Sequence, residues 1–357
     1  MNAALRVALL SSPMLFQTQG GLQIQMLETR DALRRRGIDA VLADPIREHL
    51  TAFDVVHLFS VINGNHRIAE FAASFGVPVV TSPLLQRYWT RAFGCWARTL
   101  DRVVGRLSNW MIKTEYRHIA SCLSHSNHLI ALGPTELGNL TQAFAVPPES
   151  ISIIPNGIPD RFFGADPGRF IEQTGIAPGF VLCVGAINAY KNQLGLAQAL
   201  AGSGRTLVLI GPCLPADQSY LEALRKQPHV VHLGSLAHDD PLLASAYAAA
   251  GVFCLASSAE VMPLVVLEAL AAGTPAICTR NHCMDRSRLG QVMVEVDPHD
   301  RTALRAAVDN LYLQRPPAEH CRAAVEPLRW EGVAEQLEAV YRRVRRERPA
   351  RFEVSSR

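Results

Sequence analysis

Residues 252–278 read VFCLASSAEVMPLVVLEALAAGTPAIC, and this stretch decides the fold class of the chain. A strand-like apolar run is followed by a polar loop, an apolar helical segment and a second short apolar run. Pro263 stands near the first helical position and Gly273 just past the last; proline at the start and glycine after the end are the usual boundary residues of a helix. The stretch therefore predicts a buried β–α–β unit with Glu260 just before its helix and Glu268 inside it.

The start of this helix predicts a site for an anion. The first backbone N–H groups of a helix have no intrahelical partner and attract phosphates. Here they belong to the segment Met262, Pro263, Leu264 and Val265. Carboxylates in contact with a phosphate would repel it, so Glu260 and Glu268 are better explained as acceptors for sugar hydroxyl groups. A phosphate and a polyhydroxyl group together indicate a sugar nucleotide; the alternative is a plain buried unit with two solvated glutamates.

Short apolar runs alternate with longer helical patterns along the whole chain. Strands are expected at residues 6–10, 40–42, 55–58, 79–81, 129–132, 151–154, 180–184, 206–210, 230–233, 251–255, 275–278 and 292–296. Such alternation predicts parallel sheets with helices on both faces. The turn-rich segment IPNGIP at 154–159 separates two series of strands, which indicates domains at 1–155 and 160–325. A last amphipathic helix is expected at 328–346.

Composition favours a soluble globular enzyme of the cytoplasm. The chain is 48% hydrophobic and 19% charged, with a net charge of +3. No apolar run approaches the roughly 18 residues of a membrane span, and the first residues are typical of a buried strand rather than a signal peptide. Eight cysteines without a CxxC pair indicate reduced thiols. Cys278, His282 and Cys283 lack a further ligand, so we expect no metal and no cofactor. No nucleic-acid-binding motif is present.

The spacing of Glu260 and Glu268, followed by ALAAGTPAI at 269–277, resembles the retaining nucleotide-sugar glycosyltransferases of the GT4 family (group 1 glycosyl transferases). IIPNGI at 153–158 is similar to the end of their first domain. The resemblance implies the GT-B fold, with two Rossmann-like domains whose parallel sheets face a central cleft. It implies an acceptor site in the first domain, completed by the C-terminal helix, and a nucleotide-sugar site in the second. The implied reaction moves a hexose from a UDP- or GDP-sugar to a glycan or lipid-linked acceptor, with retention.

The resemblance also implies roles for single residues. Lys191 occupies the position of a family lysine and would stabilise the leaving diphosphate. Glu260 would hold the transferred sugar and Glu268 the ribose. Gly20 and Gly21 lie between the first strand and the first helix, in a loop that faces the diphosphate in the family. The rest of the donor site would come from Asn188, Ser257, Met262, Pro263, Leu264 and Val265.

Two positions depart from the family. Ala186 follows Gly185 where relatives carry an arginine, so the guanidinium half of the phosphate clamp is missing. Strand 79–81 runs into Ser82 and Pro83, where many relatives carry a histidine near the reacting sugar. These departures leave two alternatives open: a catalytically silent GT-B protein that binds a nucleotide or a partner, and a nucleotide-sugar epimerase. A place in cell-envelope or exopolysaccharide synthesis is implied by the family alone. The base, sugar, acceptor, linkage and oligomeric state stay open.

Residues 85–119 form a basic, tryptophan-rich helical stretch with arginines on one side and apolar residues on the other. Such a helix suits an anionic membrane surface or a lipid-phosphate acceptor. On this interpretation Arg87 and Arg91 belong to an acceptor or membrane face on the inner side of the membrane. His57, which matches a common histidine position of relatives, is placed there too, although a core histidine would fit equally well. The favoured interpretation of the helix is simpler: a core-facing apolar stripe with a solvated basic back.

Overall fold

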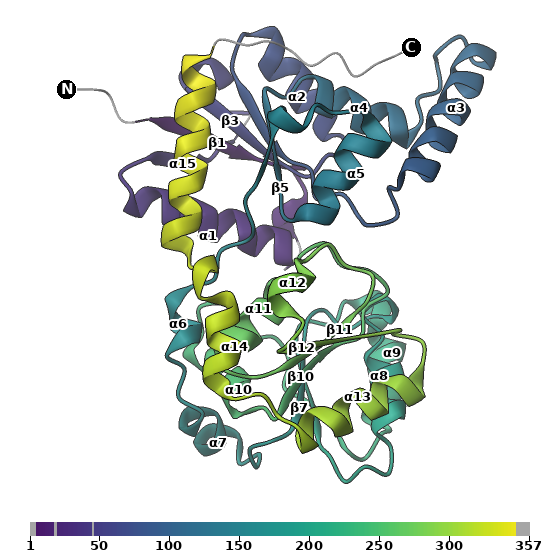
Figure 1. The fold of residues 1–357 in the computed structure, drawn as a ribbon, viewed down its shortest axis with the longest axis vertical. Helices are drawn as coiled ribbons and strands as arrows, with labels where there is room; N and C mark the ends of the chain where they lie inside the picture. The colour runs from purple at the N-terminus through teal and green to yellow at the C-terminus, as the bar shows by residue number, and fades with distance from the viewer. Residues whose placement is uncertain (1–4, 18–19, 45, 348–357) are drawn as a thin grey trace. The chain divides into compact units, whose positions relative to one another are not determined.

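The computed structural model describes residues 5–17, 20–44 and 46–347, which form two compact units. Unit 1 contains Leu22–Gly157, the strand that precedes it and the segment that begins at Trp330; unit 2 contains Ile158–Arg329. Each unit is built around a six-stranded parallel sheet with helices on both faces (Figure 1).

The sheet of unit 1 has the strand order β2-β1-β3-β4-β5-β6. Its strands are β1 (Arg6–Leu10), β2 (Asp39–Leu42), β3 (Val55–Phe59), β4 (Val79–Ser82), β5 (His128–Ala131) and β6 (Ile151–Ile153). Alternate residues of a strand point to opposite faces. Val7 and Leu9 of β1 therefore pack with α1 (Gly21–Arg35) and α15 (Trp330–Arg346). Ala8 and Leu10 join the core on the other face, which is covered by α2 (Asn65–Ser74), α3 (Arg91–Leu107), α4 (Glu115–Ser124) and α5 (Pro134–Phe144).

The sheet of unit 2 has the strand order β12-β11-β10-β7-β8-β9. Its strands are β7 (Val181–Val184), β8 (Leu207–Ile210), β9 (Val230–His232), β10 (Val252–Leu255), β11 (Ala276–Thr279) and β12 (Met293–Val296). One face is covered by α6 (Asp160–Phe163), α7 (Gly168–Thr174), α10 (Pro241–Ala249), α11 (Leu264–Ala271), α12 (Arg286–Leu289) and α14 (Ala318–Val325). The other face is covered by α8 (Gln193–Leu200), α9 (Gln218–Arg225) and α13 (Arg301–Leu313).

Every expected strand is confirmed, and each of its ends lies within one residue of the expected position. The reason is that parallel strands buried on both faces are continuous apolar runs, which stand out locally in a sequence. The C-terminal amphipathic helix is also confirmed as α15, whose buried face carries Val333, Leu337, Val340, Tyr341 and Val344. Complete burial of such a side chain stabilises the fold by about 1.5–3 kcal/mol, so this one face anchors α15 to the sheet of unit 1.

Candidate functional site

The strand order of unit 2 defines where a ligand would bind. Strands β7, β8 and β9 follow one another in one direction of the sheet, and β10, β11 and β12 in the other. The order reverses between β7 and β10, which are hydrogen-bonded neighbours. Open α/β sheets bind ligands in the crevice beyond the carboxyl ends of the strands at such a switch point. The loops after β7 and β10 carry Lys191 and Glu260, the two predicted catalytic residues.

Lys191 and Glu260 form an ion pair at this edge. Lys191 ends a single 3-10 turn, Ala189–Lys191, and its Nζ lies 2.6 Å from Glu260 Oε1. The two side chains are 23% and 14% exposed, so solvent and a ligand reach the pair. An ammonium group here can approach a phosphate, and a carboxylate can accept hydrogen bonds from hydroxyl groups. The structure thus brings the two predicted residues together at one point.

The loop that carries Glu260 is held by hydrogen bonds on both sides. Tyr190 donates from its hydroxyl to Ala259 O (2.5 Å), and Ser258 N donates to Tyr190 O (2.9 Å). Glu260 N donates to Asn281 O (2.9 Å), and Asn281 Nδ2 donates to Ser258 O (3.1 Å). Sequence reasoning missed Tyr190 and Asn281, because their contacts are with the backbone of a distant loop. They give the carboxylate of Glu260 a defined position.

Helix α11 begins directly after this loop, at Leu264, with Pro263 at its N-cap position. No side chain caps the helix, and Val266 N donates to Pro263 O (3.2 Å). The first amides of the helix, those of Leu264 and Val265, are therefore the groups that would face an anion. Met262, Leu264 and Val265 are partly exposed, whereas Pro263 is buried. The expected helix is confirmed, including its end at Ala271 before Gly273.

Ser257 and Asn188 supply polar groups next to the pair. Ser257 is fully buried, and its hydroxyl has no hydrogen-bond partner within the described part of the chain. Because Ser257 is not exposed, its predicted contact with the donor stays a prediction. Asn188 caps the turn before Lys191, because its Oδ1 accepts from Lys191 N (3.1 Å). Asn192 stands at the N-cap position of α8 but makes no capping hydrogen bond with its side chain, which donates to Pro298 O (2.6 Å).

The backbone at the end of β7 approaches the loop after β8 closely. Gly185 and Gly211 both have φ values near +150°, a region that favours glycine. A Cβ atom on Gly211 would lie 2.1 Å from Gly185 O, so no side chain fits there. The next residue, Ala186, offers only its carbonyl, which accepts from Gln193 Nε2 (2.8 Å). Lys191 is therefore the charged group that this loop presents.

Glu268 lies deeper than the ion pair, on α11. Its side chain is 3% exposed; Oε1 lies 2.7 Å from His238 Nε2, and Oε2 accepts from the hydroxyl of Tyr247 (2.8 Å). Arg161 donates to His238 Nδ1 (2.7 Å), so this nitrogen is an acceptor and the ring hydrogen is on Nε2, which donates it to Glu268. Burial and the adjacent carboxylate raise the pKa of Tyr247 well above its ordinary value. Both oxygens of Glu268 have a protein partner, and its contact with a ribose stays a prediction. Sequence reasoning missed His238 and Tyr247.

The sequence profile of the group 1 glycosyl transferases matches residues 178–314. The matched segment runs from β7 to α13 and contains Lys191, Glu260 and Glu268. The chain carries a group 1 glycosyl transferase domain. This finding supports the resemblance noted from the Glu-x7-Glu spacing.

Two curated relatives extend this similarity. The chain is 28% identical over 231 residues to the MMP α-(1→4)-mannosyltransferase of Mycolicibacterium hassiacum. The aligned segment covers 60% of this chain and 53% of that protein. It is 27% identical over 253 residues to the D-inositol 3-phosphate glycosyltransferase of Corynebacterium diphtheriae, with 64% and 59% covered. The chain thus spans little more than half of the length of these relatives.

Solved structures share the fold of both units. Sucrose-phosphate synthase from Thermosynechococcus elongatus has a TM-score of 0.75 at 20% identity, covering 95% of this chain and 99% of that chain. HepE from Anabaena, in complex with UDP, has a TM-score of 0.71 at 17% identity, covering 95% and 100%. The group 1 glycosyl transferase domain and the preceding unit therefore have the GT-B fold, with two parallel six-stranded sheets.

Gly20 comes directly before α1, and Gly21 is the first residue of this helix. A Cβ atom on either residue would meet no atom within 4 Å. Backbone with open space beside it lets a ligand come close. The predicted contact of these glycines with a diphosphate remains a prediction.

His57 is a core residue, and its placement on an acceptor or membrane face was wrong. It is 1% exposed on β3, with Nδ1 2.7 Å from the Tyr341 hydroxyl and Nε2 2.9 Å from Ser82 Oγ. Its ring stacks on Phe59, with 4.0 Å between the ring centroids. Burial lowers the pKa of His57 to about 3, so the ring is neutral. It joins β3 to β4 and α15 and has no access to a ligand.

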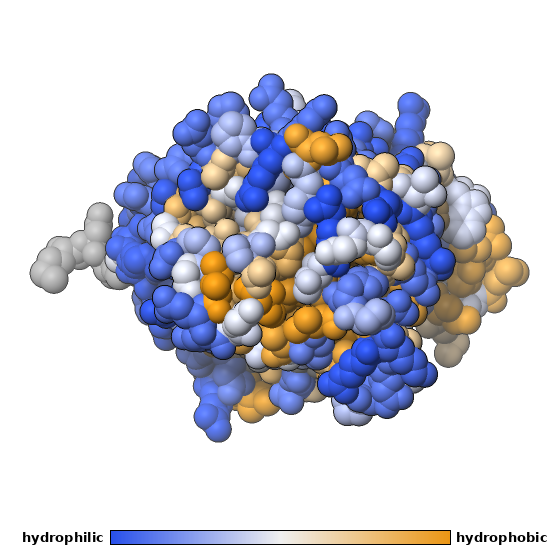
Figure 2. All heavy atoms as spheres, turned by 90° about the horizontal axis from the view of Figure 1, so that it is seen from below, coloured by the Kyte–Doolittle hydropathy of each residue, from blue (hydrophilic) through white to orange (hydrophobic). Residues whose placement is uncertain are grey.

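Helix α3 presents its apolar stripe to solvent, so the favoured core-facing interpretation was wrong. It packs through small residues instead: a Cβ atom on Gly94 would lie 2.6 Å from Ala143 Cα in α5. The exposed fractions are 58% for Trp96, 41% for Leu100, 50% for Val103 and 85% for Leu107. In Figure 2, hydrophobic residues gather at the right-hand edge, on the side where α3 projects in Figure 1. Arg91, the first residue of α3, is exposed and Arg87 is half-buried.

Within residues 5–17, 20–44 and 46–347, no group of three His, Cys, Asp or Glu side chains is arranged to hold a metal ion. Cys278, His282 and Cys283 are buried, and His282 Nε2 lies 2.9 Å from Glu295. In those ranges, no helix has the length and apolar character needed to cross a bilayer.

Proposed function

We propose that the protein transfers a hexose from a nucleoside diphosphate sugar to an acceptor hydroxyl, with retention at the anomeric carbon. The observation that carries this proposal is the pair of Lys191 and Glu260, 2.6 Å apart at the start of α11 in the group 1 glycosyl transferase domain. Cell-envelope or exopolysaccharide synthesis is the biological setting that we propose. HepE from Anabaena, which shares the fold, was solved with UDP and with UDP and glucose, which supports a nucleotide donor.

Lys191 would act on the leaving group. The bond between the anomeric carbon and the diphosphate oxygen breaks, and negative charge grows on that oxygen. The ammonium of Lys191 and the first amides of α11 would stabilise this charge, which lowers the barrier. The acceptor oxygen forms the new bond to the anomeric carbon, and its proton passes to the leaving diphosphate. No enzyme nucleophile is part of this proposal, and the cation that relieves the diphosphate charge is an ammonium rather than a metal.

Glu260 would hold the transferred sugar. Its carboxylate lies at the surface of the site and can accept from sugar hydroxyl groups once a phosphate draws Lys191 away. Glu268, with its partners His238 and Tyr247, would hold the ribose side through its remaining lone pairs. These roles place the phosphates between the two carboxylates.

The experiment combines a donor screen with a product analysis. The full chain is incubated with UDP- and GDP-hexoses, and the released nucleoside diphosphate is quantified with and without sugar acceptors. Release, with an α-configured donor giving an α-linked product, supports the proposal. Nucleotide binding without release would instead favour the catalytically silent protein. Conversion of the donor sugar without any acceptor would favour the epimerase.

We also propose a peripheral contact between unit 1 and an anionic membrane surface. The exposed apolar stripe of α3 carries Trp96, Leu100, Val103 and Leu107, and arginines lie on the same helix. Apolar side chains can enter the acyl boundary while the arginines meet anionic headgroups. A lipid-linked acceptor would reach the protein at such a surface.

A further inference from the structure

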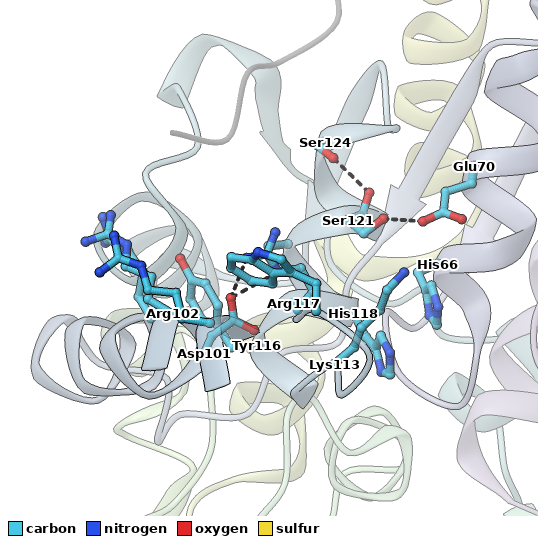
Figure 3. A pocket seen from close by; sticks show the side chains of 14 residues that line it. His66, Glu70, Asp101, Arg102, Lys113, Tyr116, Arg117, His118, Ser121 and Ser124 are labelled. Atoms are coloured by element: carbon cyan, nitrogen blue, oxygen red, sulfur yellow. Dashed lines mark hydrogen bonds and ion pairs between the residues drawn. The ribbon is translucent and has the colours of Figure 1, made fainter. Parts of the chain in front are cut away.

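A cationic pocket opens between three helices of unit 1. It has a volume of about 450 Å³ and lies among α2, α3 and α4 (Figure 3). Five of its lining side chains are cationic, namely Arg98, Arg102, Arg106, Lys113 and Arg117. Proposed donor binding uses none of them, since that site belongs to the loops of unit 2.

The two carboxylates of the pocket have partners of their own. Asp101 accepts from Arg117 Nη2 (2.7 Å) and from the hydroxyl of Thr114 (2.7 Å). Glu70 accepts from the hydroxyl of Ser121 (2.6 Å) and lies 3.5 Å from a guanidinium nitrogen of Arg67. In Figure 3, the pair of Asp101 and Arg117 lies between Arg102 and Lys113. The acidic groups of the pocket are therefore already neutralised.

The other four cations of the pocket have no carboxylate partner among the described residues. In the described part of the chain, no carboxylate forms an ion pair with Arg98, Arg102, Arg106 or Lys113. The Nε atom of Arg98 and the Nδ1 atom of His66 are buried, and no described residue bonds to them. Buried polar atoms are nearly always hydrogen-bonded in native proteins. The guanidinium of Arg98 hydrogen-bonds with the Tyr116 hydroxyl, and its buried Nε is left to donate to an acceptor from outside the chain.

The wall of the pocket is built by a tight turn. Trp110 N donates to Gly105 O (2.6 Å), and both Asn109 and Trp110 adopt left-handed backbone conformations. A Cβ atom on Gly105 would lie 2.2 Å from the indole of Trp110, so a larger residue here would displace that ring. The guanidinium of Arg117 lies 4.3 Å from the centre of the same ring. Packing against Trp110 thus holds one cation of the pocket in place before any ligand binds.

We infer that this pocket binds a phosphate group. Arginine side chains bind phosphate through two parallel hydrogen bonds, and several of them here have no carboxylate partner. The volume accommodates a phosphate together with the sugar or glycerol group that bears it. The phosphate comes either from a soluble sugar phosphate or from a lipid headgroup, whose chains would lie along the apolar stripe of α3.

Calorimetry on the full chain tests this site. The probes are inorganic phosphate, glucose 6-phosphate and dihexanoyl phosphatidic acid below its critical micelle concentration. We expect saturable phosphate binding that weakens about tenfold or more in Arg102→Gln and in Arg106→Gln, since each charged contact is worth about one order of magnitude. Arg106→Lys keeps the charge but loses the paired N–H donors of the guanidinium. Its phosphate affinity should therefore lie between those of the unaltered protein and of Arg106→Gln. If glucose 6-phosphate binds more tightly than phosphatidic acid, the phosphate comes from a soluble sugar phosphate. If phosphatidic acid binds more tightly, it comes from a lipid headgroup.

Two control variants separate this pocket from other anion sites. Arg35→Gln removes the same charge from an exposed position of α1, outside the pocket, and should bind phosphate like the unaltered protein. Lys191→Ala disables the proposed donor site and should leave unchanged the phosphate binding that depends on Arg102 and Arg106. The inference is overturned if no saturable phosphate binding occurs or if Arg35→Gln weakens it equally. Binding lost in Lys191→Ala and kept in Arg102→Gln would overturn it too.

Discussion

Lys191 Nζ lies 2.6 Å from Glu260 Oε1, although 69 residues separate the two in the chain. The contact joins the loop after β7 to the loop after β10, at the switch point of the sheet. Each charge neutralises the other until a ligand arrives. A diphosphate that binds Lys191 would free Glu260 for the hydroxyl groups of the sugar, which couples recognition of the two halves of the donor.

Lys191→Ala should lower kcat by about a hundredfold or more, because one preorganised charged donor at a developing oxyanion is worth that much. The measurement is release of nucleoside diphosphate under saturating donor. Lys226→Ala is the matched control, since Lys226 is exposed at the end of α9 in the same unit. Near-normal turnover of Lys191→Ala would remove Lys191 from the mechanism.

Tyr247→Phe should lower the free energy of unfolding by about 1.5–3 kcal/mol, because it leaves a buried carboxylate oxygen of Glu268 without its donor. Urea unfolding followed by circular dichroism measures the change. Tyr88→Phe, at a 45% exposed position, removes the same hydroxyl as a control. Equal stability of the two variants would show that the hydroxyl of Tyr247 does not support Glu268.

Stability should fall as the pH falls, in part because of His57. Burial lowers its pKa to about 3 in the folded state, whereas an unfolded histidine titrates near pH 6.5. Between these values only the unfolded state takes up the proton, so the free energy of unfolding decreases by up to about 1.4 kcal/mol per pH unit. His128, with a pKa lowered by burial to about 4, acts in the same direction.

The check is urea unfolding of the unaltered protein and of His57→Gln at pH 7 and pH 5. The loss of stability between the two pH values should be smaller in the variant. Glu136 acts in the opposite direction, because burial raises its pKa to about 7. Its contribution is the same in both proteins and cancels when they are compared at the same pH values. An unchanged difference in His57→Gln would contradict the assignment of His57 as a neutral core residue.

Turnover should persist in an excess of EDTA, because the proposed mechanism uses an ammonium group where other transferases use a divalent cation. The measurement is donor release before and after chelation, followed by addition of Mg²⁺ and Mn²⁺. Loss of activity with EDTA and recovery with either ion would show that Lys191 and the amides of α11 do not suffice.

Replacing Trp96, Leu100 and Val103 together by Ser should weaken binding to anionic vesicles about a hundredfold, since each buried apolar side chain contributes more than 1 kcal/mol. Vesicle sedimentation measures the partition. Unfolding should change little, because these side chains are 41–58% exposed. Leu313→Ser, at an 83% exposed position of α13, is the control. If the triple variant partitions like the control, α3 does not contact the membrane.

Most of the fold could be predicted from local patterns. Every strand was expected within one residue of its ends, because burial on both faces makes each strand a continuous apolar run. Helix α11 was expected from Pro263 and Gly273, whose backbone preferences act on their immediate neighbours. The positions of Glu260 and Glu268 relative to that helix followed from the same local reasoning.

Tertiary structure decided which side chains meet and which face the solvent. The carboxylate of Glu268 is held by His238 and Tyr247, which no local pattern connects. The amphipathic pattern of α3 indicated a buried stripe, but the helix packs through Gly94 and Ala97 and leaves that stripe in solvent. Periodicity shows which residues of a helix share a face; only the neighbouring helices determine whether that face is covered, because burial depends on contacts between segments distant in the chain.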